Sequence, residues 1–359
     1  MKRLMGPLVT ILLLAGLGLA IYRSAQEQLG GLNTVTIRGL IGSEKEDFFR
    51  DSDVVQTLRQ HGFVVQIEKA GSREIAGFEL KKYDFAFPGG MPAAEKIRRE
   101  SKATKMHTPF FTPMAVASWR TIAEILKAND MVEDKGGYYT LDMRKFMSLM
   151  TEGKRWKDLQ GNSSYAINKS ILVSSTDVRK SNSAAMYLAL VSFVANGNNV
   201  VENEEEIAHI LPTVQQLFLK QGFVENSSEG PFESYLLMGV GKAPLVMIYE
   251  SQYVARALAT NGGITPEMVL MYPQPTVYTK HILVPFTDSG DRLGELLETD
   301  PDLQRLAMHY GFRTSNTVGF QELMRQHKIA AADTLVDVID PPTYETIERM
   351  IQLIEKNYQ

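Results

Sequence analysis

The densest group of side chains able to bind a ligand lies between residues 174 and 183, in the run SSTDVRKSNS. This run carries five hydroxyl groups and one amide, and it precedes a segment whose apolar residues have helical spacing. Unpaired N–H groups at the start of a helix favour anions and carbonyl oxygens. We predict that four residues of the run contact a small ligand: Ser175, Thr176, Asn182 and Ser183. The alternative is a polar loop that only caps its helix.

Two further loops follow predicted strands and carry polar side chains. Residues 42–46 open a helix, where Ser43 either contacts the ligand or forms a capping box with Glu46 three residues later. Ser72 and Arg73 follow the second predicted strand, and an arginine beside a serine suits a polar or anionic ligand. A solvated surface charge is the alternative for Arg73.

The ends of two other predicted strands complete the candidate site. One strand ends at Pro88-Gly89-Gly90, and Gly89 is among the predicted contacts. Another ends a buried apolar run at Tyr249 and Glu250, where a carboxylate could bind a cationic group of the ligand. Glu250 could equally pair with a lysine or cap the next helix. If Glu250 and Arg73 both face the ligand, a zwitterion competes with a simple anion.

The sequence carries none of the catalytic or metal-binding patterns that we tested. It has no cysteine, and its six histidines are scattered without metal-ligand spacing. No G-x-S-x-G turn is present, and residues 239–243 lack the Ser or Thr of a phosphate-binding loop. We therefore expect a protein that is not an enzyme and has no cofactor and no metal.

Bulk composition indicates a folded, two-domain chain. Its 359 residues exceed one typical domain, and 44% hydrophobic with 22% charged residues is ordinary for a globular protein. The net charge is −4 and no block of like charges is present, so the sequence indicates no basic surface that could bind the phosphate backbone of nucleic acid. We expect no nucleic-acid partner.

Residues 4–22 form the only long apolar run, with Lys2 and Arg3 before it and Arg23 after it. At ~1.5 Å per residue the run spans roughly the hydrocarbon thickness of a bilayer. The basic flank predicts a signal anchor with the body outside the cytoplasmic membrane. A cleaved signal peptide, with small residues at Gly18 and Ala20, and a soluble core helix are the alternatives.

Beyond residue 33 the chain alternates between strand-like and helix-like segments, which is typical of an α/β fold. Predicted strands cover residues 34–41, 64–68, 84–87, 170–174 and 245–248. Predicted helices lie around residues 44–61, 92–99, 143–152, 182–194, 207–218, 291–297, 300–309 and 347–354. Pro212 is a predicted break or kink in the fifth of these, and Pro341 and Pro342 mark the entry of the last. Extended segments at residues 108–119 and, later in the chain, at residues 269–275 and 282–286 are candidates for the two crossovers between two lobes.

The order of these elements resembles the type II periplasmic solute-binding family. The strings that carry the resemblance are RGLIGSEKEDFF, TPFFTPMAVASW, GKRWKDL, SSTDVRKSNSAAMYLAL, APLVMIYESQY and YPQPTVYTKHILVPF. It implies a two-lobed, periplasmic-binding-protein-like type II fold with two crossover segments, here preceded by an N-terminal transmembrane helix. The implied parts are an anchor and linker (1–32), a discontinuous first lobe (33–115 plus 280–359) and a second lobe (116–279).

The resemblance also implies a function. We expect a membrane-tethered solute-binding protein that captures a small polar or anionic ligand between its lobes. Its partners would be that small molecule, the inner membrane through the N-terminal helix, and an ABC-type transporter or other membrane protein. The alternative is a structural or assembly component that keeps the fold without a ligand.

Overall fold

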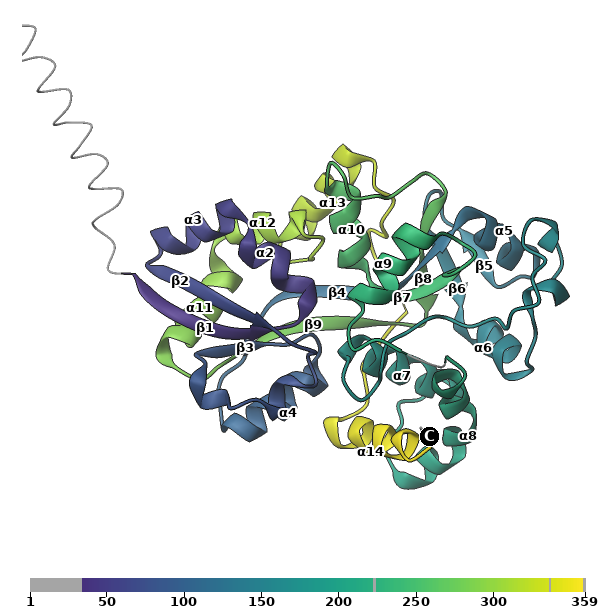
Figure 1. The fold of residues 1–359 in the computed structure, drawn as a ribbon, viewed down its shortest axis with the longest axis horizontal. Coiled ribbons are helices and arrows are strands. Elements are labelled where there is room, and N and C mark those ends of the chain that lie inside the picture. The colour runs from purple at the N-terminus through teal and green to yellow at the C-terminus, as the bar shows by residue number, and fades with distance from the viewer. Residues whose placement is uncertain (1–33, 222–223, 336, 358–359) are drawn as a thin grey trace, which may run out of the picture.

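The structure is a computed structural model that describes residues 34–221, 224–335 and 337–357. The predicted anchor and linker, residues 1–32, lie outside the described residues. Figure 1 shows two α/β lobes side by side, connected by the long strands β4 and β9. Within the described ranges, no helix is both long and apolar enough to cross a membrane.

The first lobe is a three-layered unit around a mostly parallel sheet. Its strands are β1 (Val35–Ile41), β2 (Phe63–Lys69) and β3 (Phe85–Phe87), and its helices are α2 (Glu46–Arg50), α3 (Ser52–Gln60), α4 (Met91–Ser101), α11 (Asp288–Thr299) and α12 (Pro301–His309). Strand β1 pairs in parallel with both β2 and β3. Packed aromatic rings, including those of Phe48, Phe85 and Phe110, fill one side of the sheet and hold α2 against it.

Two crossover strands carry the chain between the lobes. They are β4 (His107–Trp119) and β9 (Thr276–Pro285), and they pair with each other antiparallel from Phe110 opposite His281 to Pro113 opposite Tyr278. At its far end β4 pairs instead with strands of the second lobe. The two predicted crossovers are thus present as one central ribbon that belongs to both lobes.

The second lobe is built on a mixed sheet. Its strands are β5 (Val132–Asp134), β6 (Tyr139–Asp142), β7 (Leu245–Tyr249) and β8 (Met268–Gln274), and its helices are α5 (Arg120–Ala128), α6 (Met143–Thr151), α7 (Asn182–Ala195), α8 (Glu204–Leu219), α9 (Glu229–Met238) and α10 (Glu250–Leu258). Helix α7 is buried on nearly all sides, which explains its almost uniformly apolar sequence. It forms the centre of the lobe's main core.

The C-terminal segment crosses back over both lobes. It contains α13 (Thr317–His327), β10 (Val338–Ile339) and α14 (Tyr344–Glu355). Ile347, Met350 and Ile351 of α14 are buried in the main core of the second lobe, whereas the predicted boundary assigned this helix to the first. Figure 1 shows α14 lying below α4 and beside α8. Because α14 packs in the core of the second lobe, we assign this helix to the second lobe instead of the first.

Three predicted elements differ from the structure. Residues 170–174 are not a strand, because they make only single bridges, Ser170 to Arg155 and Ser174 to Val246. The helix predicted after β1 is divided into α2 and α3, since the Asp51 backbone is extended and its side chain caps α3. Pro212 lies inside a continuous α8 instead of ending it.

Candidate functional site

Loops from the two lobes meet in front of the crossover ribbon. Ser43 and Ser72 of the first lobe and Tyr249 of the second line one small cavity of about 10 Å³. Ser72 Oγ accepts a hydrogen bond of 2.9 Å from the Gly89 amide, and the Arg73 amide donates to the Lys180 carbonyl of the other lobe over 3.2 Å. Predicted contact residues therefore do converge, around a chamber with room for about one water molecule.

A buried charged cluster borders this chamber through Glu44. Glu44 forms an ion pair with Lys45, and the Lys45 ammonium lies 3.1 Å from His281 Nδ1. Lys45 and His281 are fully buried. Burial raises the pKa of Glu44, but Lys45 and His281 lower it by more, so the net pKa lies below its ordinary value. Burial and the Lys45 charge lower the pKa of His281 to about 4, which keeps its ring neutral at pH 7.

Asn182 connects the start of α7 to this chamber. Its amide nitrogen donates to the Tyr249 hydroxyl over 3.1 Å, and its carbonyl oxygen is buried without a partner. Gly90 lies against the amide, and a Cβ at that position would come within 2.3 Å of it. Gly90 also has φ +90°, a conformation that L side chains rarely adopt. The second glycine of Pro88-Gly89-Gly90 thus lets α4 approach α7 closely.

The remaining residues of the hydroxyl-rich loop face other ways. Thr176 and Ser183 share a buried hydrogen bond of 3.0 Å between their hydroxyl groups, and Ser183 also contacts the hydroxyl of Ser181. Ser175 lies at a separate cavity in the second lobe, where its buried hydroxyl has no partner. From this loop, Ser181 lines the chamber, Asn182 reaches the Tyr249 hydroxyl at its wall, and the Lys180 carbonyl accepts a hydrogen bond from the first lobe.

Arg73 and Glu250 are both held in ion pairs within the chain. The buried Arg73 guanidinium binds Glu348 of α14, although its Nε and Nη1 have no partner. Both oxygens of Glu250 accept from Arg313, at 2.7 and 2.8 Å, and one also accepts from the Tyr272 hydroxyl. Of the alternatives for Glu250, the structure shows pairing within the chain, with arginine in place of lysine. Its carboxylate is therefore occupied, and we leave it out of the site.

The capping box expected at the start of the first helix is absent. Ser43 makes no capping hydrogen bond, and Glu46 binds Lys69 and Arg50 instead. The Ser43 side chain is consequently not committed to its own helix. It lines both the small chamber and a larger groove outside it.

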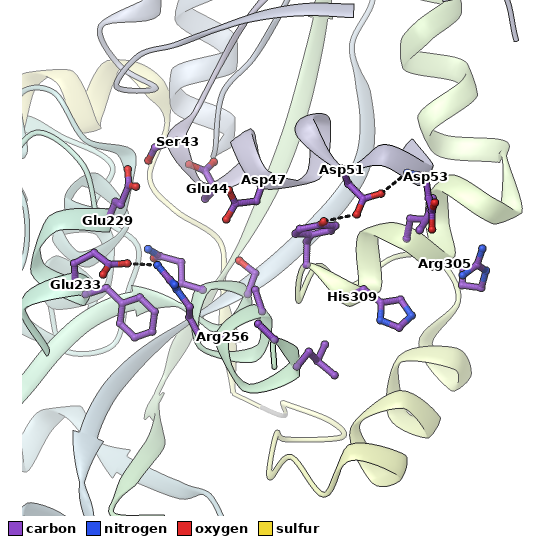
Figure 2. A pocket seen from close by; sticks show the side chains of 18 residues that line it. Ser43, Glu44, Asp47, Asp51, Asp53, Glu229, Glu233, Arg256, Arg305 and His309 are labelled. Atoms are coloured by element: carbon purple, nitrogen blue, oxygen red, sulfur yellow. Dashed lines mark hydrogen bonds and ion pairs between the residues drawn. The ribbon is translucent and has the colours of Figure 1, made fainter. Parts of the chain in front are cut away.

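This outer groove, of about 560 Å³, opens between the two lobes. Figure 2 shows α2 above it, α10 below it, α9 at one end and α12 at the other. Six carboxylates and two guanidinium groups line it: Glu44, Asp47, Asp51, Asp53, Glu229, Glu233, Arg256 and Arg305. Burial and the nearby Arg305 lower the pKa of His309, also in the wall, so its ring is neutral at pH 7. The groove is strongly acidic.

Sequence reasoning missed most of the groove. The sequence pattern gives Asp47 the look of an ordinary charge on a helix surface, and α9 has almost no regular apolar spacing. Ser251 is the exception that a signal could have found, because it directly follows Tyr249 and Glu250 at the end of β7. In the described part of the chain, no group of three His, Cys, Asp or Glu side chains could hold a metal ion.

Comparison with known proteins identifies the fold. No family model and no curated protein matches the sequence. Several solved structures match the chain over most of its length. The periplasmic binding protein AfuA from Actinobacillus pleuropneumoniae, with fructose-6-phosphate bound, gives a TM-score of 0.58 at 11% identity, covering 90% of this chain and 98% of that one.

Two further structures agree. The sulfate-binding protein SubI from Mycobacterium tuberculosis H37Rv gives a TM-score of 0.57 at 14% identity, covering 88% of this chain and 98% of its own. The ferric binding protein from Campylobacter jejuni gives 0.55 at 8% identity, with 89% and 98% covered. The chain has the fold of periplasmic solute-binding proteins, and the resemblance seen in the sequence is confirmed at this level.

Proposed function

We propose that this chain is a two-lobed solute-binding protein that captures a small polar solute in the outer groove and carries out no covalent chemistry. The observation that carries the proposal is the groove itself. Its volume of about 560 Å³ falls within the usual range for small-molecule sites, and both lobes contribute to its walls. The structural neighbours named above are binding proteins, which supports the same function.

We further propose that the protein acts outside the cytoplasmic membrane, tethered by residues 4–22. There it would deliver its solute to an ABC-type transporter or another membrane partner. The apolar run at the N-terminus and the transport role of proteins with this fold support this part of the proposal. A tethered protein suits one dedicated partner at the membrane surface.

One observation favours the alternative, an assembly component without a ligand. The inner chamber, where the predicted contacts converge, measures only about 10 Å³, and Glu44 in its wall is already paired with the chain's own Lys45. A protein that keeps the fold but binds no solute would have such a chamber. The outer groove is the feature that this alternative leaves unexplained.

Equilibrium dialysis against a small-molecule cell extract, followed by mass spectrometry of retained compounds, separates the two functions. The native chain should retain a compound near equimolar amount. Ala255→Trp, which fills the groove from α10, should lose it, whereas Ala208→Trp on the exposed face of α8 should not. No retained compound, or equal retention by Ala255→Trp, would contradict solute binding in the groove.

A further inference from the structure

We propose that the solute of the outer groove is a small organic cation, an inference that rests on the solute-binding function proposed above. The walls carry six carboxylates against two guanidinium groups, a formal charge of −4 with His309 neutral. A cleft lined by one sign of charge concentrates ligands of the opposite sign and repels those of its own. The negative charge of the walls would therefore repel an anionic solute.

Each of the two guanidinium groups in the wall already has an acidic partner within the chain. Arg256 pairs with Glu233 across the end of the groove. Arg305 pairs with Asp302, a carboxylate outside the groove, at 3.3 Å. Each arginine thus compensates a single carboxylate. Of the other wall carboxylates, Glu44 is paired with the buried Lys45, and Glu229 lies 3.4 Å from the Lys69 ammonium.

Two of the remaining wall carboxylates, Asp47 and Asp51, have no cationic side chain in an ion pair with them in the part of the chain that the structure describes. Asp51 accepts from the Tyr310 hydroxyl at 2.7 Å and from the Asp53 and Val54 amides, all of them neutral donors. Asp47 makes no side-chain hydrogen bond or ion pair with any described residue. In Figure 2, Asp47 projects from α2 toward the space above α10. It is the natural partner for a positive group in that space.

The hydroxyl group of Ser251 is a second, independent feature of the same groove. Ser251, in the first turn of α10, is 2% exposed and lines the groove, and its hydroxyl has no hydrogen-bond partner. Buried hydroxyl groups are normally hydrogen-bonded, because an unmet partner costs free energy. A solute with an N–H or O–H group would donate a hydrogen bond to the Ser251 hydroxyl on the α10 side of the groove. Asp47, on the α2 side, would pair with the positive charge of the same solute.

The shape of the site selects an organic cation over a metal ion. Calcium needs six to eight oxygen ligands around one point, and the carboxylates of the wall are spread over α2, α3 and α9. Within the described ranges no three metal-binding side chains cluster. A groove of this volume instead suits an extended molecule bearing an amine, guanidinium or quaternary ammonium group.

Calorimetric titration with defined probes tests the charge of the solute. The probes are putrescine, choline and L-arginine, with glucose and sulfate as neutral and anionic counterparts. We expect at least one cation to bind, more weakly at high salt, and neither counterpart to bind. Asp47→Asn should weaken that binding at least tenfold, because hydrogen bonds to charged groups are the strong ones. Glu152→Gln, an exposed carboxylate on the far side of the second lobe, should leave it unchanged.

The outcomes distinguish this inference from the function on which it rests. Binding of glucose or sulfate without any cation, or retention of a neutral or anionic compound in the dialysis, would overturn the cation and leave solute binding intact. Cation binding that survives Asp47→Asn and high salt would also overturn it. Failure of the dialysis to retain any compound would instead overturn solute binding itself.

Discussion

His281 lies on the crossover strand β9, fully buried beside Lys45, and its Nε2 has no hydrogen-bond partner. Nothing in the sequence indicated this role, since the six histidines are scattered and none has a partner at short spacing. The ring and Lys45 come together only because β9 returns to the first lobe next to β3 and β4. Such contacts between distant residues are set by topology, which local patterns do not encode.

Burial of His281 predicts a dependence of stability on pH. Its pKa is about 4 in the folded chain and near 6.5 when unfolded, so above pH 6.5 the ring is neutral in both states. Between these values only the unfolded chain takes up a proton, and stability falls as the pH falls. The free energy of unfolding should drop by about 2 kcal/mol from pH 7 to pH 5 through this residue alone.

Urea unfolding at the two pH values measures this loss. His281→Gln removes the titrating ring and should lose less stability over the same interval, whereas His327→Gln, on an exposed residue, should follow the native chain. Equal losses for the native chain and His281→Gln would show that the ring does not titrate with a lowered pKa.

Among the predicted contacts, the sequence was informative where a loop follows a strand. Ser43, Ser72, Gly89 and Tyr249 come together between the lobes because each lies at the end of a strand or in the loop after it, whereas Asn182 reaches them from the start of α7. Arg73 and Glu250 were less predictable, since their partners Glu348 and Arg313 come from the C-terminal segment, far along the chain. The acidic character of the groove was not foreseen, and a cationic solute fits it better than the anion that the serines suggested.

At the scale of elements, many of the predicted strands and helices agree with the structure. The strands β1, β2, β3 and β7 and the helices α4, α6, α7, α12 and α14 lie within a few residues of their expected positions. Helices α5, α9, α10 and α13 were not predicted. Helix α9 has almost no amphipathic pattern, so tertiary packing decides its conformation.

Helix α14 ties the lobes together, and its packing can be tested. Ile351 is 3% exposed within the core of the second lobe, while Glu348 on the same helix reaches Arg73 of the first. Ile351→Ala should lower the free energy of unfolding by about 2 to 5 kcal/mol, through lost burial and the cavity left behind. Chemical denaturation measures this change.

Gln352→Ala supplies the matched control, because Gln352 is exposed on the same helix. It should change stability by less than about 0.5 kcal/mol. An Ile351→Ala variant as stable as Gln352→Ala would mean that α14 does not contribute to the core of the second lobe. The C-terminal boundary of the lobes would then need to be redrawn again.

At the scale of the whole molecule, helices of the two lobes line one acidic groove. The ribbon joins the lobes on one side, and loops from both lobes close the inner chamber. Composition and element order were sufficient to predict two lobes with two crossovers. The groove depends on how far the lobes close on each other, which no single segment of the sequence determines.

The most direct test of solute capture between the lobes is a crystal structure of the chain with the compound retained in dialysis. The account predicts density for that compound in the outer groove, contacting Asp47 of α2 and Ser251 of α10. Contacts from both lobes are the essential result. Density elsewhere would contradict the account, for example in the cavity of about 400 Å³ beside Thr279 and Met186.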